Sequence, residues 1–495
     1  MTFKTSVITG QALSIMVDSV KSLRFRDCFS QLMAYLNTPC LDKVCILYGL
    51  RRTGKTTMLK QAVAALNLEA CAYIKVSARN TMEDIEHDLN LLYSLGVRYA
   101  FIDEVTLMQE FIDSASIFSD VFVATGMKVV LAGTDSLSFW LASDQELYDR
   151  GILIHTTYIP FHEHCHLLNT SNLDLYIQHG GILKAGEWDF EDIRLLSGEL
   201  SFLNDDSSRR YIDTAICRNI QNSLSFYEQG GHFRHLYTLY LNGQLTNIIN
   251  RIIEDMNHAF VRNTVISTLD PEARTSLFTA IDKEQVTLKL MELLSISNDI
   301  SDISDTVVQE VKEYLAALDL VIASPVETVT GSETISHPIF TQPGMRFCQA
   351  KALVHAISKD PAFAFASEQD KALAEARILD EVRGRMMEDI VLLETSKFIP
   401  SNKRAFKLQF ARGEFDMVVY DNITHSCEIY EVKHSNQTNH MQYRHLLDSE
   451  KCTATEHRFG PIVKRAVIYT GLSQCLDCGV EYLNVNEYLN TFSGG

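Results

Sequence analysis

The chain has 495 residues, 46% of them hydrophobic and 22% charged, and a formal net charge of −19. This length is too great for a single hydrophobic core, so we expect two to four folded domains. The negative charge argues against a protein that coats DNA regardless of sequence. No apolar run approaches about 18 residues, so we expect no helix that spans a membrane and no membrane as a partner. The N-terminus lacks an apolar signal core and the eleven cysteines are scattered, which together predict a cytoplasmic protein with reduced thiols.

The first motif of the chain follows a short apolar run. Residues 44–57 read VCILYGLRRTGKTT, so a predicted strand leads into the pattern Gly-x-x-x-x-Gly-Lys-Thr and then into good helix formers. Strand, glycine loop and helix are the context of a Walker A phosphate-binding loop. Lys55 is expected to reach the β- and γ-phosphates of ATP, and the Thr56 hydroxyl is expected to ligate Mg²⁺. For Arg51 and Arg52, packing or an ion pair is an equal alternative to a nucleotide contact. The residues expected to bind the nucleotide here are Gly49, Arg51, Arg52, Thr53, Gly54, Lys55, Thr56 and Thr57.

A second motif lies 48 residues after Lys55. There an apolar strand that begins at Tyr99 ends in the two carboxylates of Asp103 and Glu104. In this Walker B position, Asp103 would hold Mg²⁺ through water and Glu104 would polarise the water that attacks ATP. We therefore expect ATP and Mg²⁺ as cofactors, and an enzyme that hydrolyses ATP.

Two more predicted strands, residues 72–76 and 128–132, alternate with helix-like stretches and indicate a parallel α/β sheet. One strand separates the Walker A and Walker B strands in the sequence, and this order resembles the additional-strand ATPases, which include the AAA+ group. The resemblance assigns a polar sensor role to Thr134, at the end of the strand after Walker B; a helix N-cap is the alternative. Arg150, ahead of the next strand, would be a phosphate-sensing arginine, a finger offered to a neighbour in a homo-oligomer, or a surface arginine.

Two patterns resemble zinc sites but are incomplete. Residues 162–166 read HEHCH and match H-E-x-x-H, the pattern of zinc proteases. They come where the ATPase sheet is expected to end, so we interpret them as the start of a helix in the connection to the next domain. Cys475 and Cys478 form one CxxC without a second pair nearby, whereas a structural zinc takes four ligands. We expect free thiols there and no zinc at either place.

The middle of the chain is predicted to be mostly helical. Residues 166–235 are polar and helical apart from a Gly-Gly break, which suits the small helical lid that follows an ATPase core. Within residues 236–345, a helix near Val307 runs into a β segment and then into a hairpin that closes with ETVTGSETISH. That order resembles a winged-helix module, which would bind DNA or pack between domains. The acidic segment 299–313 favours packing.

The C-terminal part carries a second group of ionisable residues, on three predicted strands over residues 404–410, 413–420 and 428–433. Asp416 and Glu431 would lie on adjacent strands of a hairpin. Glu431 and Lys433, two positions apart, would share one face of the sheet. Glu388, on a predicted helix, would supply a third carboxylate. Carboxylates and a lysine that converge in this way can bind Mg²⁺ and activate water against a phosphodiester.

This arrangement resembles the PD-(D/E)xK nuclease superfamily, in which a helix acid, an Asp and an E-x-K pair meet on a central sheet. By that resemblance, Glu388, Asp416 and Glu431 would be metal ligands, and Lys433 would orient or activate the water. Asp416, Glu431 and Lys433 are thus the expected catalytic residues. The residue before Asp416 is phenylalanine where the motif has proline. The basic segment 401–413 favours a nucleic-acid backbone as ligand. The alternatives are a nuclease-like fold used as a structural cap, or a hairpin with surface ion pairs.

We therefore predict an α/β fold with four domains. They are a P-loop ATPase core of the additional-strand, AAA+-like type (1–165), a helical lid (166–235), a winged-helix-like region (236–345) and an α/β restriction-endonuclease-like domain (346–495). This order resembles prokaryotic AAA-like or STAND-related ATPases with a C-terminal nuclease-like domain, for which roles in defence or mobile-element biology are proposed. The resemblance implies that the nucleotide state gates a Mg²⁺-dependent nuclease. The alternative is a nucleotide-dependent switch whose C-terminal domain only binds nucleic acid or a partner protein.

Overall fold

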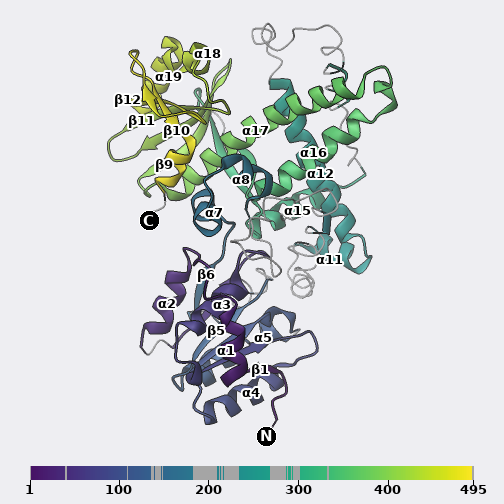
Figure 1. The fold of residues 1–495 in the computed structure, drawn as a ribbon, viewed down its shortest axis with the longest axis vertical. Helices are drawn as coiled ribbons and strands as arrows, with labels where there is room; N and C mark the ends of the chain where they lie inside the picture. Colours follow the sequence, from purple (N-terminus) through teal and green to yellow (C-terminus); the bar gives the residue numbers. More distant parts are fainter. Residues whose placement is uncertain are drawn as a thin grey trace.

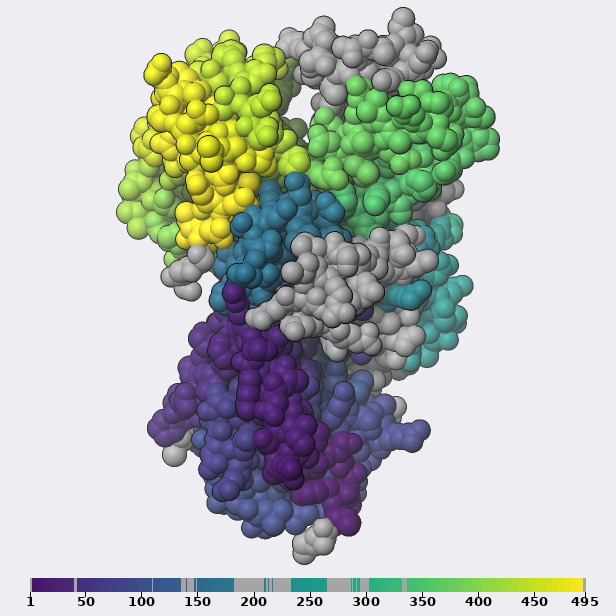
Figure 2. All heavy atoms as spheres, viewed as in Figure 1, coloured from purple at the N-terminus to yellow at the C-terminus, as the bar shows by residue number. Residues whose placement is uncertain are grey.

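A computed structural model gives the fold of the chain. It describes residues 2–39, 42–108, 110–134, 149–181, 233–267, 302–331 and 334–492, with scattered positions between these ranges. The molecule is elongated (Figures 1 and 2): an N-terminal α/β part lies at one end, and a C-terminal sheet lies at the other end beside a group of helices. Within the described ranges, every helix is too short or too polar to cross a lipid bilayer.

A six-stranded sheet forms the N-terminal part, with the strand order β1-β3-β4-β5-β2-β6. All neighbouring strands are parallel except β1, which is antiparallel to β3. Helices α1, α2 and α3 pack on one face, and α4 and α5 on the other, which explains why the strands read as apolar runs. The elements are β1 Ser6–Ile8, α1 Gly10–Asp18, α2 Phe29–Asn37, β2 Val44–Tyr48, α3 Lys55–Ala64, β3 Cys71–Lys75, α4 Met82–Ser94, β4 Tyr99–Asp103, α5 Phe111–Ser114, β5 Lys128–Ala132 and β6 Gly151–His155.

The predicted parallel α/β core of additional-strand type is confirmed. Strand β5 lies between β2, which precedes the glycine loop, and β4, which ends in Asp103. Because these strands are parallel, their C-terminal ends meet at one edge of the sheet. The glycine loop, the Asp103-Glu104 pair and Thr134 therefore come from three different strand ends but lie at the same edge.

An eight-stranded sheet forms the C-terminal part, with the order β13-β14-β12-β11-β10-β9-β7-β8. The long helix α17 and the short helix α20 pack on one face, and α19 packs on the other. Strands β9, β10 and β11 match the three predicted strands to within two residues. The elements are β7 Val321–Thr328, β8 Thr334–Phe340, α17 Glu368–Phe398, β9 Lys403–Gln409, β10 Glu414–Asp421, β11 Ser426–Lys433, α18 His440–Tyr443, α19 Ser449–Phe459, β12 Ile462–Tyr469, β13 Gln474–Cys475, β14 Glu481–Asn484 and α20 Val485–Asn490.

The hairpin β7–β8 differs from the sequence prediction. We expected it to close a winged-helix region that ends at residue 345, but β7 also pairs in parallel with β9, so the hairpin extends the C-terminal sheet. The domain boundary at 345 therefore cuts through a continuous sheet. A hairpin carries no local signal for the third strand beside it, which is why the sequence pattern alone placed it with the preceding helix.

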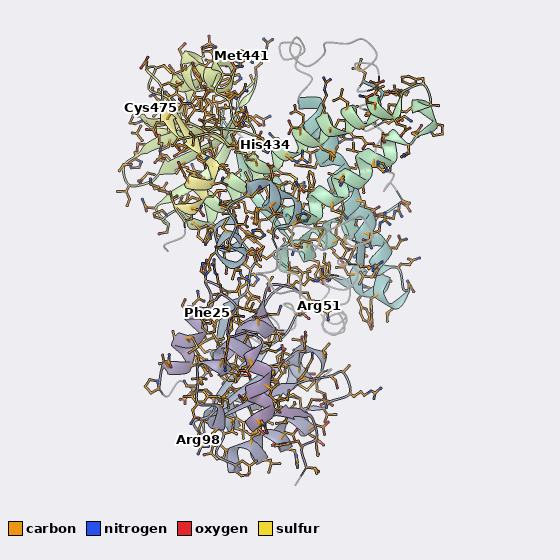
Figure 3. The ribbon with its side chains drawn as sticks, in the orientation of Figure 1. Phe25, Arg51, Arg98, His434, Met441 and Cys475 are labelled. Carbon is orange, nitrogen blue, oxygen red and sulfur yellow. The ribbon has the colours of Figure 1, made fainter. Side chains whose placement is uncertain are left out.

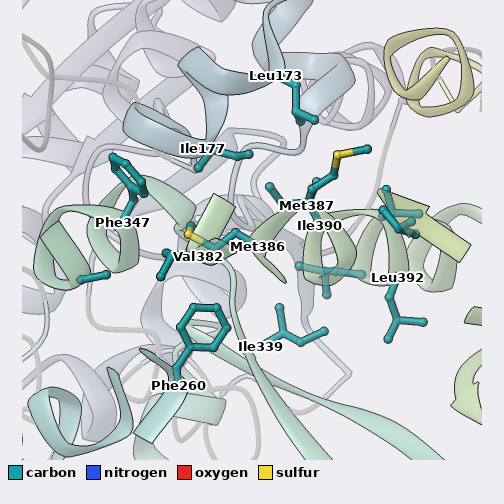
Figure 4. Close-up of a cluster of buried hydrophobic side chains, with 14 of the residues drawn as sticks. Leu173, Ile177, Phe260, Ile339, Phe347, Val382, Met386, Met387, Ile390 and Leu392 are labelled. Atoms are coloured by element: carbon teal, nitrogen blue, oxygen red, sulfur yellow. The ribbon is translucent and has the colours of Figure 1, made fainter. Parts of the chain in front are cut away.

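Among the described residues, five further helices come between the two sheets in the sequence, and a sixth, α16, follows β8. The predicted lid, residues 166–235, lies largely outside the described residues. One hydrophobic cluster joins α8, α12, α16, α17 and β8 (Figure 4), so the helices of the middle region and the C-terminal sheet share a core. The helices are α7 Phe161–Leu168, α8 Leu173–His179, α11 Arg234–Leu241, α12 Leu245–Ser267, α15 Asp305–Ala317 and α16 Pro343–Ser358.

The segment that follows β6 contacts the residue ahead of β7 and the C-terminal end of α17. The Thr157 hydroxyl donates to the Asp319 carboxylate ahead of β7, and the Phe161 N–H donates to the Glu394 carboxylate on α17. Lys397, one turn further along α17, lies 4.2 Å from the centre of the Tyr158 ring. The N-terminal sheet is thus attached to α17 through this short segment and α7.

Glu394 makes this attachment sensitive to pH. Its side chain is buried, and burial raises the pKa of Glu394 to about 7. In the unfolded chain the same carboxyl ionises near pH 4.5, so the folded protein holds an extra proton between about pH 4.5 and 7 and stability falls as pH rises through that window. We expect Glu394→Gln to melt at the temperature of the wild type near pH 4.5 and at a higher temperature at pH 8, where the difference is of order 3 kcal/mol. Thermal melts from pH 4.5 to 8 test this; a difference that does not change with pH would contradict it.

Candidate functional site

The glycine loop joins the end of β2 to the start of α3. Gly49 and Gly54 have φ angles of 137° and 91°, and Arg52 between them has a φ angle of 65°. A Cβ atom at position 49 would lie 2.6 Å from the Thr156 carbonyl oxygen, so glycine is required where the loop passes the end of β6. The loop then ends at the N-terminus of α3, which favours an anion such as a phosphate.

Lys55 lies inside this loop. Its side chain is buried, and its amine donates to the carbonyl oxygens of Gly49 and Leu50, both at 2.7 Å. Burial lowers the pKa of Lys55 to about 8, while the carboxylates of Glu104 and Asp103 act in the opposite direction. A buried amine whose hydrogen-bond partners are neutral carbonyls has a strong electrostatic gain from an anion that enters the loop.

The two residues expected to hold Mg²⁺ are in contact. The Thr56 hydroxyl donates to Oδ2 of Asp103 at 2.8 Å. The same oxygen accepts a hydrogen bond from the Tyr73 hydroxyl at 2.6 Å, and Oδ1 accepts the N–H of Glu104 at 3.1 Å. A hydroxyl and a carboxylate at this spacing are oxygen ligands of the kind that Mg²⁺ prefers, so the donor set fits the ion. Sequence reasoning missed Tyr73, whose only signal was its place on the strand next to the Asp103 strand.

Glu104 comes directly after β4, at a φ angle of 60°, and its side chain approaches the sensor candidate. Its Oε2 accepts a hydrogen bond from the hydroxyl of the buried Thr134 at 3.4 Å. Burial, and then the charge of Asp103, raise the pKa of Glu104 above its usual range. A carboxylate with a raised pKa is a better acceptor for the proton of an attacking water.

The remaining loop residues have different surroundings. The Thr53 hydroxyl donates to the Leu50 carbonyl and bonds the Thr156 hydroxyl, both at 2.8 Å, so this side chain holds the loop in shape. Thr57 is half-buried on the first turn of α3. Arg51 is exposed, and Figure 3 shows it on the side of the N-terminal part that faces the rest of the molecule. A nucleotide contact for the two loop arginines remains a prediction.

Arg150 lies at the opposite edge of the sheet. Its carbonyl accepts the N–H of Val44, the first residue of β2, whereas the glycine loop follows the last residue of β2. Its exposed guanidinium pairs with Asp120 at 2.8 Å. A five-residue strand separates this position from the loop by about 15 Å. The role of a phosphate-sensing arginine at the same chain's loop does not fit this position, because parallel strands begin at one edge and the loop leaves from the other.

Arg26 lies behind the glycine loop, and no motif pointed to it. Its buried guanidinium donates to the Thr53 carbonyl and to both carboxylate oxygens of Glu163. Glu163 belongs to the HEHCH sequence, which forms the start of α7 as predicted, and His162 pairs with Asp27 at 2.8 Å. The glutamate of this zinc-protease pattern is therefore part of an ion pair. Sequence reasoning missed Arg26 because its partner is 137 positions away.

The C-terminal candidate residues also converge. Glu388 on α17 and Glu414 and Asp416 on β10 each offer a carboxylate oxygen within 4.8 Å of the other two. On the neighbouring strand, the Lys433 amine lies 3.0 Å from Oδ2 of Asp416 and 2.8 Å from Oε2 of Glu431. The other Glu431 oxygen, Oε1, is buried and has no hydrogen-bond partner among the described residues. We call Glu388, Glu414, Asp416, Glu431 and Lys433 the acid cluster. Its donor set fits a divalent cation.

Three residues that the motif did not single out belong to the cluster or touch it. Glu414 could have been identified from the sequence, because it lies two positions before Asp416 at the start of the predicted strand. Arg385 and Lys407 could not, because their contacts depend on how α17 and β9 pack. The Arg385 guanidinium lies 2.5 Å from Glu388 and 3.1 Å from Glu414, and the Lys407 amine lies 3.3 Å and 3.1 Å from the same two residues. Three cations therefore face four carboxylates.

The charges set different protonation states within the cluster. Burial, and then the charge of Asp416, raise the pKa of Glu431 to about 8 and also raise the pKa of Glu388. The pKa of Asp416 lies below its usual range because the charges of Lys433 and Lys407 outweigh its burial. The pKa of Lys433 is raised because Asp416 and Glu431 outweigh its burial. Asp416 is thus the most strongly ionised acid, and a cation that binds Glu431 would displace a proton.

Most of the basic side chains in segment 401–413 form ion pairs with carboxylates of the same chain. Lys403 pairs with Glu428 at 3.2 Å, Arg404 pairs with Glu327, and Lys407 lies in the cluster just described. These three side chains are therefore engaged by carboxylates, which weakens the expectation that the segment as a whole binds a nucleic-acid backbone. Cys475 and Cys478 are exposed thiols.

Residues 41–165 match the family model of the AAA domain. This part of the chain, which holds the glycine loop and the Asp103-Glu104 pair, is therefore an AAA-type P-loop ATPase domain. The match ends within α7 and does not include the later helices or the C-terminal sheet. No curated protein matches the sequence.

Several solved structures align with the chain at low similarity. AMPPCP-bound DnaA from Aquifex aeolicus is 14% identical, covering 63% of this chain and 88% of that chain, with a TM-score of 0.23. The Hsp104–ADP complex from S. cerevisiae is 10% identical, covering 81% and 56%, with a TM-score of 0.28. Aeropyrum pernix ORC1 in complex with DNA is 15% identical, covering 70% and 95%, with a TM-score of 0.24. Scores this low do not establish a shared overall architecture.

Proposed function

We propose that the N-terminal domain binds ATP with Mg²⁺ and hydrolyses it. The observation that carries this proposal is the meeting of Lys55, Thr56, Asp103 and Glu104 at one edge of the sheet, with Thr56 and Asp103 in direct contact at 2.8 Å. Together these residues supply what phosphoryl transfer to water requires. Lys55 is the cation, Thr56 and Asp103 are the two Mg²⁺ ligands, and Glu104 is the acceptor for the proton of the water.

The chemistry follows from the positions of these groups. The loop backbone and Lys55 would hold the phosphates, and Thr56 and Asp103 would hold Mg²⁺, which neutralises charge on the phosphates when bound. Glu104 would orient the attacking water, and its contact with Thr134 gives the carboxylate a fixed direction. Catalysis of this kind depends mainly on position and electrostatics rather than on covalent steps.

Glu104→Gln is expected to retain ATP binding and to lose hydrolysis. Glutamine has nearly the shape of glutamate but cannot take the proton of the water, so we expect turnover to fall by about 100-fold or more while the affinity for ATP changes little. Phosphate release and equilibrium titration with a fluorescent nucleotide measure the two effects. Glu83→Gln, on the first turn of α4, is the matched control. Hydrolysis at the wild-type rate in Glu104→Gln would contradict the role.

We further propose that the acid cluster is the site of a Mg²⁺-dependent nuclease, as in PD-(D/E)xK enzymes, and that the nucleotide state gates it. Support comes from the approach of Asp416 and Glu431 to the same Lys433 amine, and from the three carboxylates that can share a cation. The charge of Lys433, which lies beside both acids, would stabilise a hydroxide that develops there when a cation is bound.

The alternative is a nucleotide switch whose C-terminal part only binds nucleic acid or a partner protein. One observation favours it: Arg385 and Lys407 pair with Glu388 and Glu414, and Lys433 pairs with Asp416 and Glu431, so each of the four carboxylates has a cationic partner within the protein. The two proposals predict different results. The nuclease proposal requires the acid cluster for cleavage of nucleic acid, whereas the alternative requires it only for binding of nucleic acid or a partner protein. Assembly into a homo-oligomer is an additional proposal for the AAA domain.

A further inference from the structure

Arg26 connects the glycine loop to the rest of the molecule. Its guanidinium donates to Thr53, the loop residue directly before Gly54-Lys55, and to both oxygens of Glu163 on α7. A third, longer contact reaches the Thr157 carbonyl at 3.4 Å. The arginine is buried, with 5% of its surface exposed, so these contacts are shielded from water. A change in the loop at Thr53 therefore changes the surroundings of a buried ion pair.

The ion pair holds the start of α7 by more than one bond. Glu163 also accepts the N–H of Asp27 at 2.8 Å, and Asp27 pairs with His162 at 2.8 Å. The segment 26–27 and the first turn of α7 are thus joined by several contacts. Removal of one partner from a buried ion pair leaves an uncompensated charge and is strongly destabilising, so the Arg26–Glu163 pair favours its present geometry.

The same turn of α7 contacts α17. The Phe161 N–H donates to the Glu394 carboxylate, and the rings of His162 and Phe398 meet edge to face at 4.9 Å. Helix α17 runs without a break from Glu368 to Phe398. Glu388, a member of the acid cluster, lies six residues before Glu394 on this helix, which is about 9 Å along its axis.

We propose that Arg26 is a positioning residue that couples the nucleotide loop to the acid cluster through Glu163, α7 and α17. When phosphates occupy the loop, the position of the Thr53 carbonyl changes, Arg26 and Glu163 follow, and α7 shifts the end of α17 that carries Glu394. The proposal rests on the ATP site proposed above and names the regulation of the acid cluster. The test of this coupling is whether a ligand in the nucleotide loop changes the part of α17 that carries Glu388 and Glu394.

Hydrogen exchange of the full chain provides that test. In wild-type protein, AMPPCP with Mg²⁺ is expected to change amide exchange in residues 161–168 and 385–398, which lie far from the loop in the sequence. In Arg26→Lys, which keeps the charge but loses the two-pronged contact, and in Glu163→Gln, we expect the nucleotide to bind with an affinity within about tenfold of wild type while the change in 385–398 is lost. Two variants are used so that the test survives if one of them does not fold.

Arg24→Ala is the matched control. Arg24 belongs to the same segment and donates to the His166 carbonyl and to Asn169 at the end of α7, but its contacts do not include the glycine loop. We expect this variant to keep the nucleotide-dependent change in 385–398. If wild-type protein binds AMPPCP and 385–398 does not respond, or if both coupling variants keep the response, the coupling is wrong and the ATP site stands. If wild-type protein does not bind AMPPCP, the proposed function fails as well.

Discussion

Lys55→Ala is expected to abolish the binding of ATP. The amine is buried within the loop and bonds the carbonyl oxygens of Gly49 and Leu50 at 2.7 Å, so it is already placed where the phosphates of a nucleotide would lie. Alanine removes the cation and leaves these carbonyls facing the phosphates. We expect affinity to fall by at least about 100-fold, which corresponds to about 2.7 kcal/mol. Equilibrium titration with a fluorescent ATP analogue measures the loss.

The control for this substitution is Lys60→Ala. Lys60 lies on the same helix, α3, five residues further on, and is only half-buried. Lys60→Ala also removes one positive charge from α3, but it leaves the Lys55 amine in the loop. The affinity for ATP should therefore stay close to that of wild type. An affinity for ATP that is unchanged in Lys55→Ala would remove the basis of the nucleotide-site assignment.

Asp416→Asn is expected to eliminate nucleic-acid cleavage and to leave ATP binding intact. Asp416 is the most strongly ionised acid of the cluster, and it contacts Lys433 at 3.0 Å and the Val432 N–H at 2.8 Å. Asparagine keeps the size of the side chain but removes the charge that would hold a divalent cation. We expect cleavage to fall by about 100-fold or more. The assay uses single- and double-stranded DNA and RNA with Mg²⁺ or Mn²⁺, with and without ATP.

The control here is Asp421→Asn, the same chemical change at the other end of β10. Asp421 lies at the exposed turn before β11 and should have no effect on cleavage. Equal cleavage by Asp416→Asn and wild type would show that another site or a contaminant is responsible. A wild-type protein that cleaves none of these substrates in the presence of ATP would contradict the nuclease proposal and favour the binding-only alternative.

The N-terminal site could be predicted because its chemistry is encoded in contiguous residues. Lys55 and Thr56 follow the glycine loop directly, and Asp103 and Glu104 follow one strand, so the order of the strands alone brings them together. Of the roles open to Arg150, that of a phosphate-sensing arginine at the same chain's loop does not fit, for a reason that the sequence contained. A residue that precedes a parallel strand lies at the edge opposite to the loop, and the register of Val44 with the start of β6 shows this.

The C-terminal site could be predicted only in part. The hairpin of Asp416 and Glu431 follows from local pattern, and Glu388 was placed on the correct helix. The contacts of Lys407 and Arg385 could not be predicted, since they require the packing of α17 against the sheet. The Arg26–Glu163 pair and the attachment of β7 to β9 had no local signal either, because each joins segments far apart in the sequence.

The most direct test of the central claim is a structure of the full chain with AMPPCP and Mg²⁺. We predict that the triphosphate follows the loop from Gly49 to Thr56, that the Lys55 amine moves from the loop carbonyls to the phosphates, and that Mg²⁺ lies between the Thr56 hydroxyl and the side of Asp103. A nucleotide bound elsewhere on the protein, with Lys55 still on the carbonyl oxygens of Gly49 and Leu50, would contradict this account.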